Sequence, residues 1–321
     1  MDENKTRQPV RLLTIGSANV GQRIDNFLMV VLKGAPKSLV YRLLRTGQVR
    51  VNKGRIKQTY RLQVDDIVRI PPVSVSPEGE RERPSKGLCN AISKSIIYED
   101  ENLIIIDKPS GIAVHGGSGV ANGVIEIMRA IRPEEKGVEL VHRLDRQTSG
   151  CLMLAKNRST LLALHELLRD NLIDKRYYAL VHGYWEDDER TVNFPLLKDR
   201  SESGIRHVRV SQEGQPSTTR FTVKRHFSHQ MTLVEAKPLT GRMHQIRVHT
   251  AHAGHPILGD ETYGKRTLNR ALKKQGLKRL FLHAHCLTFM LPSTMKKISV
   301  TAPLSPELVA FIDSLNDGTH L

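Results

Sequence analysis

A single carboxylate, Asp145, lies between two guanidinium groups, Arg143 and Arg146, in the polar run from His142 to Gly150. An Asp beside two Arg residues is commonly a surface ion pair that adds well under ~1 kcal/mol to stability. A carboxylate held in a fixed position can instead act as a nucleophile or as a base. We expect Asp145 to do covalent chemistry, with the surface ion pair as the alternative.

The residues on either side predict how Asp145 is positioned. Residues 139–141 and the apolar run 151–155 have the length and composition of strands. The polar segment between them is therefore expected to be a loop that joins two core strands. Such a loop can keep a reactive side chain both exposed and fixed.

The run from His142 to Gly150 resembles the central motif of the RluA-type pseudouridine synthases, whose Asp is the indispensable catalytic residue. Four more segments resemble the other motifs of this family, and they follow in the family's order. They are residues 98–111 for the first motif, 175–181 for the tyrosine strand, 239–249 for the arginine motif and 279–285 for the last motif. Five signatures in the order of the family are not expected by chance.

The resemblance implies an isomerisation. In this family the bond from ribose to the base nitrogen of uridine breaks, the base turns, and the same sugar carbon bonds to a ring carbon. The reaction involves no net redox change, so we expect no cofactor and no metal. Asp145 would either attack the sugar or remove a sugar proton to give an unsaturated intermediate, and both routes stay open.

The same resemblance assigns roles to four further residues. Arg247 matches the arginine that pairs with the catalytic Asp, and Tyr177 matches the tyrosine that stacks on the uracil ring. Leu282 fits the apolar wall, and Arg143 would occupy the space that the flipped base leaves in the RNA. From the residues alone, Tyr177 could equally be a core aromatic, and Tyr178 beside it would face the other way.

Length and charge agree with an enzyme that acts on RNA. At 321 residues the chain exceeds the usual ~100 to 200 residues of one domain, which favours two domains. The 49 Lys and Arg against 33 Asp and Glu leave a formal net charge of +16, which favours a polyanionic partner. No apolar run approaches the ~18 residues of a transmembrane helix, and no apolar signal region follows the amino terminus. We expect a cytoplasmic monomer without membrane contact.

Residues 1–80, with a core at about 21–72, are expected to form a small RNA-binding domain. Residues 22–72 carry eleven Lys and Arg against three acids, a net charge of +8. A helix beginning near Pro36 would have one apolar and one basic face, and the order of elements resembles the S4 RNA-binding module. The expected phosphate contacts are Lys37, Ser38, Arg42, Arg45, Arg50, Lys53 and Arg55. A merely solvated basic face is the alternative.

The rest of the chain is predicted to be a linker, residues 81–95, and a catalytic domain, residues 96–321. The pattern predicts an α+β fold built on a mainly antiparallel central sheet, as the family also has. Expected strands are 103–106, 151–155, 177–182, 208–210, 219–227, 231–236, 281–290 and 298–301. Expected helices are 124–131, 159–171, 243–253 and 306–315.

Competing sites fail on spacing. The run His115–Gly119 lacks the remaining glycine and the acidic residue of a dinucleotide loop. Four histidines lie within residues 244–255, but Cys and acidic ligands are missing from this segment, so a metal is not expected.

Two rival functions remain. The chain could be a ribosome-assembly factor that binds rRNA, or another RNA enzyme such as a methyltransferase. The S4-like module and the runs 114–119 and 209–214 imply, by resemblance within the family, that the substrate is a set of uridines in 23S rRNA.

Overall fold

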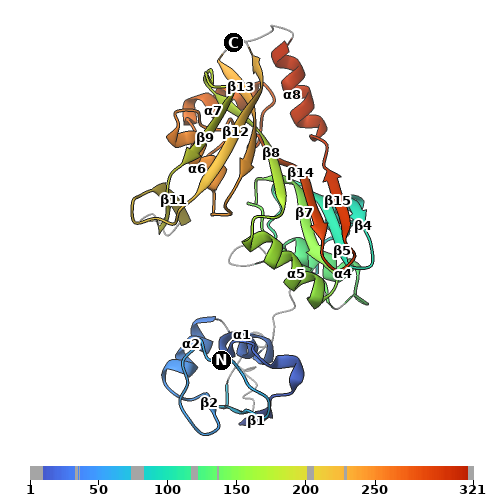
Figure 1. The fold of residues 1–321 in the computed structure, drawn as a ribbon, viewed down its shortest axis with the longest axis vertical. Helices are drawn as coiled ribbons and strands as arrows, with labels where there is room; N and C mark the ends of the chain where they lie inside the picture. The colour runs from blue at the N-terminus through green and yellow to red at the C-terminus, as the bar shows by residue number, and fades with distance from the viewer. Residues whose placement is uncertain are drawn as a thin grey trace, which may run out of the picture. The chain divides into compact units, whose positions relative to one another are not determined.

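The computed structural model describes residues 10–32, 35, 37–73, 83–116, 122–135, 137–200, 206–227 and 230–316. The chain forms two compact units, Met1–Glu82 and Arg83–Leu321, which we call the amino-terminal unit and the carboxy-terminal unit (Figure 1). Each has hydrophobic clusters of its own. The two units are therefore described separately.

The amino-terminal unit is a three-stranded antiparallel sheet, in the order β1-β3-β2, with two helices. Its elements are β1 (Arg11–Thr14), a 3-10 turn (Ser17–Asn19), α1 (Ile24–Val31), α2 (Lys37–Arg45), β2 (Arg50–Val51) and β3 (Ile67–Ile70). Helix α2 confirms the predicted two-faced helix, because Val40 and Leu43 are buried whereas Arg42 and Arg45 are exposed. The unit therefore presents a basic helix face on a small apolar core.

The linker predicted at residues 81–95 is wrong over most of its length. Lys86–Lys94 form helix α3, whose first turn is capped by Ser85 Oγ accepting a hydrogen bond from the amide of Leu88 at 3.3 Å. Ile92 is fully buried and packs with the residues of helix α4 (Val124–Ile131). One buried position in a nine-residue helix leaves too little periodicity for a sequence pattern to show.

The carboxy-terminal unit is built on a ten-stranded sheet in the order β4-β5-β7-β14-β8-β13-β12-β9, with β15 beside β14 and β6 beside β7. Its strands are β4 (Ile96–Glu99), β5 (Leu103–Lys108), β6 (Glu139–Leu140), β7 (Ser149–Ala155), β8 (Asp174–His182), β9 (Glu189–Asn193), β12 (Thr218–Phe227), β13 (Met231–Pro238), β14 (Leu282–Leu291) and β15 (Lys296–Thr301). Among the strands that the structure describes, only β14 and β7 pair in parallel. The predicted α+β fold with a mainly antiparallel sheet is confirmed. A separate hairpin is formed by β10 (Leu196–Arg200) and β11 (Arg206–Val210).

Helices cover both faces of this sheet. Besides α3 and α4 they are α5 (Arg158–Arg169), α6 (Gln245–His252), α7 (Arg266–Lys274) and α8 (Pro306–Asn316). Strand β5 is buried on both sides, because Ile104 and Ile106 pack with α3 and α4 whereas Leu103 and Ile105 pack with α5. Helices α6, α7 and α8 lie by the β8–β12 half of the sheet (Figure 1). Within the described ranges, no helix is long and apolar enough to cross a membrane.

Candidate active site

The five residues predicted for chemistry and base binding line one pocket of about 510 Å³ in the carboxy-terminal unit. Arg143 and Asp145 come from the loop between β6 and β7, Tyr177 from β8, Arg247 from α6 and Leu282 from β14. Strands β7, β14 and β8 are neighbours in the middle of the sheet. Segments more than 100 residues apart therefore meet because the sheet places their strands side by side.

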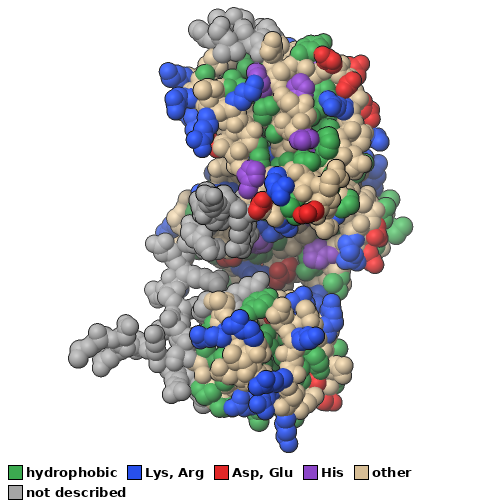
Figure 2. All heavy atoms as spheres, turned by 90° about the vertical axis from the view of Figure 1, so that its left-hand side faces the viewer, with side chains coloured by type: hydrophobic (Ala, Val, Ile, Leu, Met, Phe, Trp, Pro, Cys, Tyr) green, Lys and Arg blue, Asp and Glu red, His purple; other side chains and the backbone are tan. Residues whose placement is uncertain are grey.

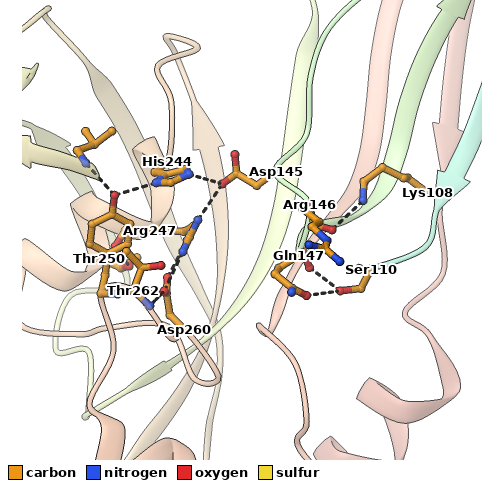
Figure 3. Close-up of polar contacts among 12 residues, drawn as sticks. Lys108, Ser110, Asp145, Arg146, Gln147, His244, Arg247, Thr250, Asp260 and Thr262 are labelled. Carbon is orange, nitrogen blue, oxygen red and sulfur yellow. Dashed lines mark hydrogen bonds and ion pairs between the residues drawn. The ribbon is translucent and has the colours of Figure 1, made fainter. Parts of the chain in front are cut away.

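The carboxylate of Asp145 is held by Arg247, as the sequence predicted. Arg247 Nη1 donates to Asp145 Oδ2 at 3.2 Å, and the Asp145 side chain stays 27% exposed towards the pocket. The alternative, a surface ion pair of Asp145 with Arg143 or Arg146, is not found among the described residues. Arg146 Nε donates to the carbonyl of Gly111 at 2.8 Å instead, and Arg143 is exposed at the pocket wall. Figure 3 shows Arg146 turned away from Asp145.

A second carboxylate, Asp260, fixes the guanidinium of Arg247. Arg247 Nε and Nη2 donate to the two oxygens of Asp260 at 2.8 and 2.9 Å, which is a bidentate pair (Figure 3). The amides of Thr262 and Tyr263 also donate to Asp260, whose side chain is 1% exposed. Burial alone would raise the pKa of Asp260, but Arg247 and the amides outweigh it and hold that pKa below its usual value. The remaining nitrogen of this fixed guanidinium, Nη1, is thus the one that donates to Asp145.

His244 approaches the same oxygen of Asp145 and is itself held by a tyrosine. His244 Nε2 lies 3.8 Å from Asp145 Oδ2, and its Nδ1 is 2.8 Å from the hydroxyl of Tyr263. That hydroxyl accepts from the amide of Val208 in β11 at 3.0 Å, so its own proton is available to Nδ1. This pattern favours the tautomer whose proton is on Nε2, facing Asp145. Burial lowers the pKa of His244, so the ring is neutral at neutral pH.

The back of the loop is held by Lys108, at the end of β5. Its ammonium donates to the carbonyls of Pro109, Ile112 and Arg146 at 2.9, 2.9 and 3.2 Å. Burial lowers the pKa of Lys108 to about 7, but three carbonyl acceptors match the three donors of an ammonium and favour the charged form. Ser110 Oγ donates to the carbonyl of Gln147 at 2.7 Å (Figure 3). The loop that carries Asp145 is therefore held from the side opposite Arg247 (Figure 3).

Gly150 allows strand β7 to start close beside β14, where the loop that carries Asp145 ends. Its φ is +106°, and a Cβ at this position would collide with the carbonyl of Ala284. Ser149 and Gly150 form the short parallel pairing with His283 and Ala284. The close approach of β7 and β14 brings Asp145 and Leu282 to the same pocket.

The pocket has an aromatic and an apolar wall. Tyr177 is partly buried, and burial raises its pKa, so its hydroxyl is protonated at neutral pH. Leu282 is 3% exposed. Tyr178 faces the other side of β8, where its ring stacks on His285 at 3.8 Å between centroids. The predicted opposite facing of the two tyrosines is confirmed.

The amino-terminal unit has a basic hollow of about 900 Å³. Of the seven residues predicted to contact phosphates, Ser38, Arg42, Arg45 and Arg55 line it, together with Tyr41 and Lys57. Arg50 and Lys53 are exposed but lie outside the lining, and the Arg50 side chain donates to the carbonyls of Gly47 and Lys53. Lys37 begins α2, and its side chain is outside the described residues. Figure 2 shows Lys and Arg spread over this unit.

The comparisons with known proteins agree with this arrangement. Residues 102–252 match the model of the RNA pseudouridylate synthase family, and residues 22–68 match the S4 domain. The chain is 50% identical to "Ribosomal large subunit pseudouridine synthase C" of Pasteurella multocida, covering 98% of this chain and 97% of that protein. The protein of the same name from Escherichia coli K12 is 51% identical, covering 98% and 99%. The chain therefore belongs to the RNA pseudouridylate synthase family, whose members are isomerases.

Two solved human structures have a similar fold over about 70% of this chain. "Human RNA Pseudouridylate Synthase Domain Containing 4" is 26% identical with a TM-score of 0.59, covering 72% of this chain and 96% of that one. "Human RNA Pseudouridylate Synthase Domain Containing 1" is also 26% identical, with a TM-score of 0.56, covering 68% and 86%. Both likenesses support the enzyme class.

Sequence reasoning missed three residues that shape the site. Asp260 and Tyr263 are not predicted as site residues, since nothing in the segment around them marks an acid or a phenol as functional. His244 is considered from the sequence only as a metal ligand, although it lies in the segment 239–249 that resembles the arginine motif. Among the described residues, no group of three or more His, Cys, Asp or Glu is placed to hold a metal ion.

Proposed function

We propose that this protein isomerises specific uridines of 23S rRNA to pseudouridine, with Asp145 as the reactive carboxylate and the target nucleotide flipped out of the RNA. The observation that carries the proposal is the position of Asp145, which is partly exposed in a pocket and aligned by Arg247 at 3.2 Å. The names of the relatives, which are large-subunit synthases, support the substrate class. Because ribosomal RNA is found in the cytoplasm, we expect the protein to act there.

The pocket suits a nucleotide more than a helical stretch of RNA. Its volume of about 510 Å³ is within the usual ~300 to 1,000 Å³ of small-molecule sites. A flipped uracil would stack on Tyr177 and pack against Leu282, with its ribose towards Asp145. Arg143, which is exposed at the wall, would fill the gap that the flipped base leaves in the RNA.

The reaction is balanced without a cofactor. The bond between C1′ and N1 breaks, a bond between C1′ and C5 forms, the proton on C5 is lost and N1 gains a proton. Asp145 either attacks C1′ or removes a proton from the ribose, and both routes need an ionised carboxylate. The guanidinium of Arg247 stabilises that charge, and Asp260 keeps Arg247 from swinging away. Tyr177, whose hydroxyl stays protonated, can donate a hydrogen bond to the base.

RNA would be held by the basic hollow of the amino-terminal unit. The cations Arg42, Arg45 and Arg55 are exposed there, with no carboxylate within 4 Å among the described residues. Contacts of this kind bind phosphates without reading the base. They would supply affinity for rRNA, whereas the pocket would do the chemistry.

The test is Asp145→Asn, which keeps the shape of the side chain and removes its charge. Loss of the C5 hydrogen as tritium from 5-tritiated uridine in 23S rRNA transcripts measures turnover directly. We expect the variant to lose all measurable release while its RNA affinity stays within about tenfold of the wild-type value. Turnover near the wild-type rate would refute the mechanism.

A pseudouridine map of 23S rRNA tests the substrate. Cells that lack this gene are complemented with the wild-type chain or with Asp145→Asn. We expect specific sites to be restored by the wild type only. A map that is unchanged by deletion would refute 23S rRNA as the substrate, and growth rescue by Asp145→Asn without modification would favour the ribosome-assembly factor.

A further inference from the structure

Helix α7 carries an exposed cluster of cations that the proposed chemistry does not use. Residues 265–278 hold six Lys and Arg and no acid. All six are exposed: Lys265, Arg266, Arg270, Lys273, Lys274 and Lys278. Most of this segment forms the helix.

The cations of α7 occupy one face of the helix. At about 100° per residue, Arg266, Arg270, Lys273 and Lys274 fall within an arc of about 100°. The opposite side holds Leu272, which is fully buried in the core beside β8 and β13. The helix is therefore anchored by its apolar side and presents a continuous basic stripe to solvent.

This stripe, which we call the α7 basic face, is short of neutralising partners. Lys273 pairs with Glu261 at 2.6 Å. Arg266, Arg270 and Lys274 have no carboxylate within 4 Å among the described residues. Like charges four residues apart repel one another on a helix, so an anion that spans the face would be bound favourably.

A buried asparagine ties α7 to the catalytic machinery. Asn269, 3% exposed, accepts from the amide of Gly259 at 3.1 Å and donates to the carbonyl of Asp260 at 2.8 Å. Asp260 is the residue that fixes Arg247 against Asp145. A partner bound on α7 is thus in a fixed register with the reactive carboxylate.

We propose that the α7 basic face binds the sugar–phosphate backbone of the substrate RNA and so positions the target uridine, independently of the amino-terminal unit. The inference rests on the proposed function. Charge complementarity and the rigid link through Asn269 carry it. An anionic membrane is a poorer fit, because a helix lying on lipid would turn its apolar side outward, whereas Leu272 is in the core.

The test removes three unpaired charges in Arg266→Gln, Arg270→Gln, Lys274→Gln. The matched control removes three exposed charges elsewhere on the same unit, in Lys86→Gln, Arg158→Gln, Lys297→Gln. RNA affinity is measured at several salt concentrations on a 23S rRNA fragment, together with single-turnover rates at saturating enzyme. Circular dichroism verifies that both proteins are folded, and Arg270→Gln alone replaces the triple variant if it is not.

We expect the α7 variant to bind RNA about tenfold more weakly or worse, with a salt slope shallower by roughly 0.7 to 0.9 for each lost phosphate contact. Its rate at saturation should stay within about twofold of wild type. Affinity and slope equal to those of the control would overturn the inference. So would unchanged RNA binding with lost binding to vesicles of phosphatidylglycerol and phosphatidylcholine. Absence of turnover by the wild-type chain would instead refute the proposed function, which keeps the two failures distinct.

Discussion

Asp260→Asn perturbs the site at a buried residue that does not line the pocket itself. The substitution keeps the oxygen that accepts from the amides of Thr262 and Tyr263, and it replaces the oxygen that accepts from Arg247 Nε by an amide group. The new amide group and Arg247 Nε are both donors, and they then face each other where the wild-type atoms lie 2.8 Å apart. Arg247 also loses the charge that neutralises it in a pocket wall where its side chain is only 9% exposed.

The expected size of the effect follows from burial. Removing one partner of a buried ion pair costs about 3 to 5 kcal/mol. Because Arg247 keeps Asp145 at 3.2 Å, we expect the lower end, about 3 kcal/mol of unfolding free energy. A free guanidinium would also draw Asp145 out of alignment, so the single-turnover rate should fall by roughly 10- to 100-fold, which corresponds to about 1.4 to 2.7 kcal/mol.

Urea unfolding, tritium release and RNA binding separate these effects. RNA affinity should be unchanged, because Asp260 is 1% exposed. The matched control is Asp187→Asn, which removes an exposed carboxylate 4.0 Å from Arg190 and should cost less than about 1 kcal/mol. If Asp260→Asn behaves like this control in both stability and rate, the bidentate pair does not position Arg247 and the reasoning fails.

Two further predictions concern the pocket wall and pH. Tyr177→Phe should keep base stacking and slow turnover more than it weakens RNA binding. Tyr178→Phe, on the other face of β8, should have kinetics near those of the wild type. If steady-state kinetics show the larger loss for Tyr178→Phe, the assigned facing is refuted. Burial lowers the pKa of His249 and of His283 to about 4, from about 6.5 in the unfolded chain. Their contribution to stability is therefore complete above pH 6.5 and is lost as the pH falls towards 4, at about 1.4 kcal/mol per pH unit for each residue. We expect His283→Gln to lessen the pH dependence of the unfolding free energy, measured in urea between pH 7 and pH 5, by about 1.4 kcal/mol per pH unit. A pH dependence equal to that of the wild type would contradict the assignment.

Local pattern was enough for the elements that carry strong apolar periodicity. The strand at 103–106, the strand at 151–155 and the helix at 124–131 were predicted, because both faces of β5 and β7 are buried and α4 has a wide apolar face. The chain order strand, loop, strand around Asp145 was predicted for the same reason. Helices α3 and α7 were not, because each is short and rich in polar residues.

The sequence by itself predicted five residues of the pocket, because each lies in a segment that resembles a motif of the family. Only the tertiary structure decided what each residue contacts there. Arg146 is next to Asp145 in the chain but turns to Gly111, whereas Arg247, 102 residues away, reaches Asp145. Asp260 and Tyr263 contact Arg247 and His244, although no sequence motif around them indicates a role in the site. The reason is physical: hydrogen bonds and ion pairs between distant segments depend on how the central strands are ordered, and no short stretch of sequence records that order.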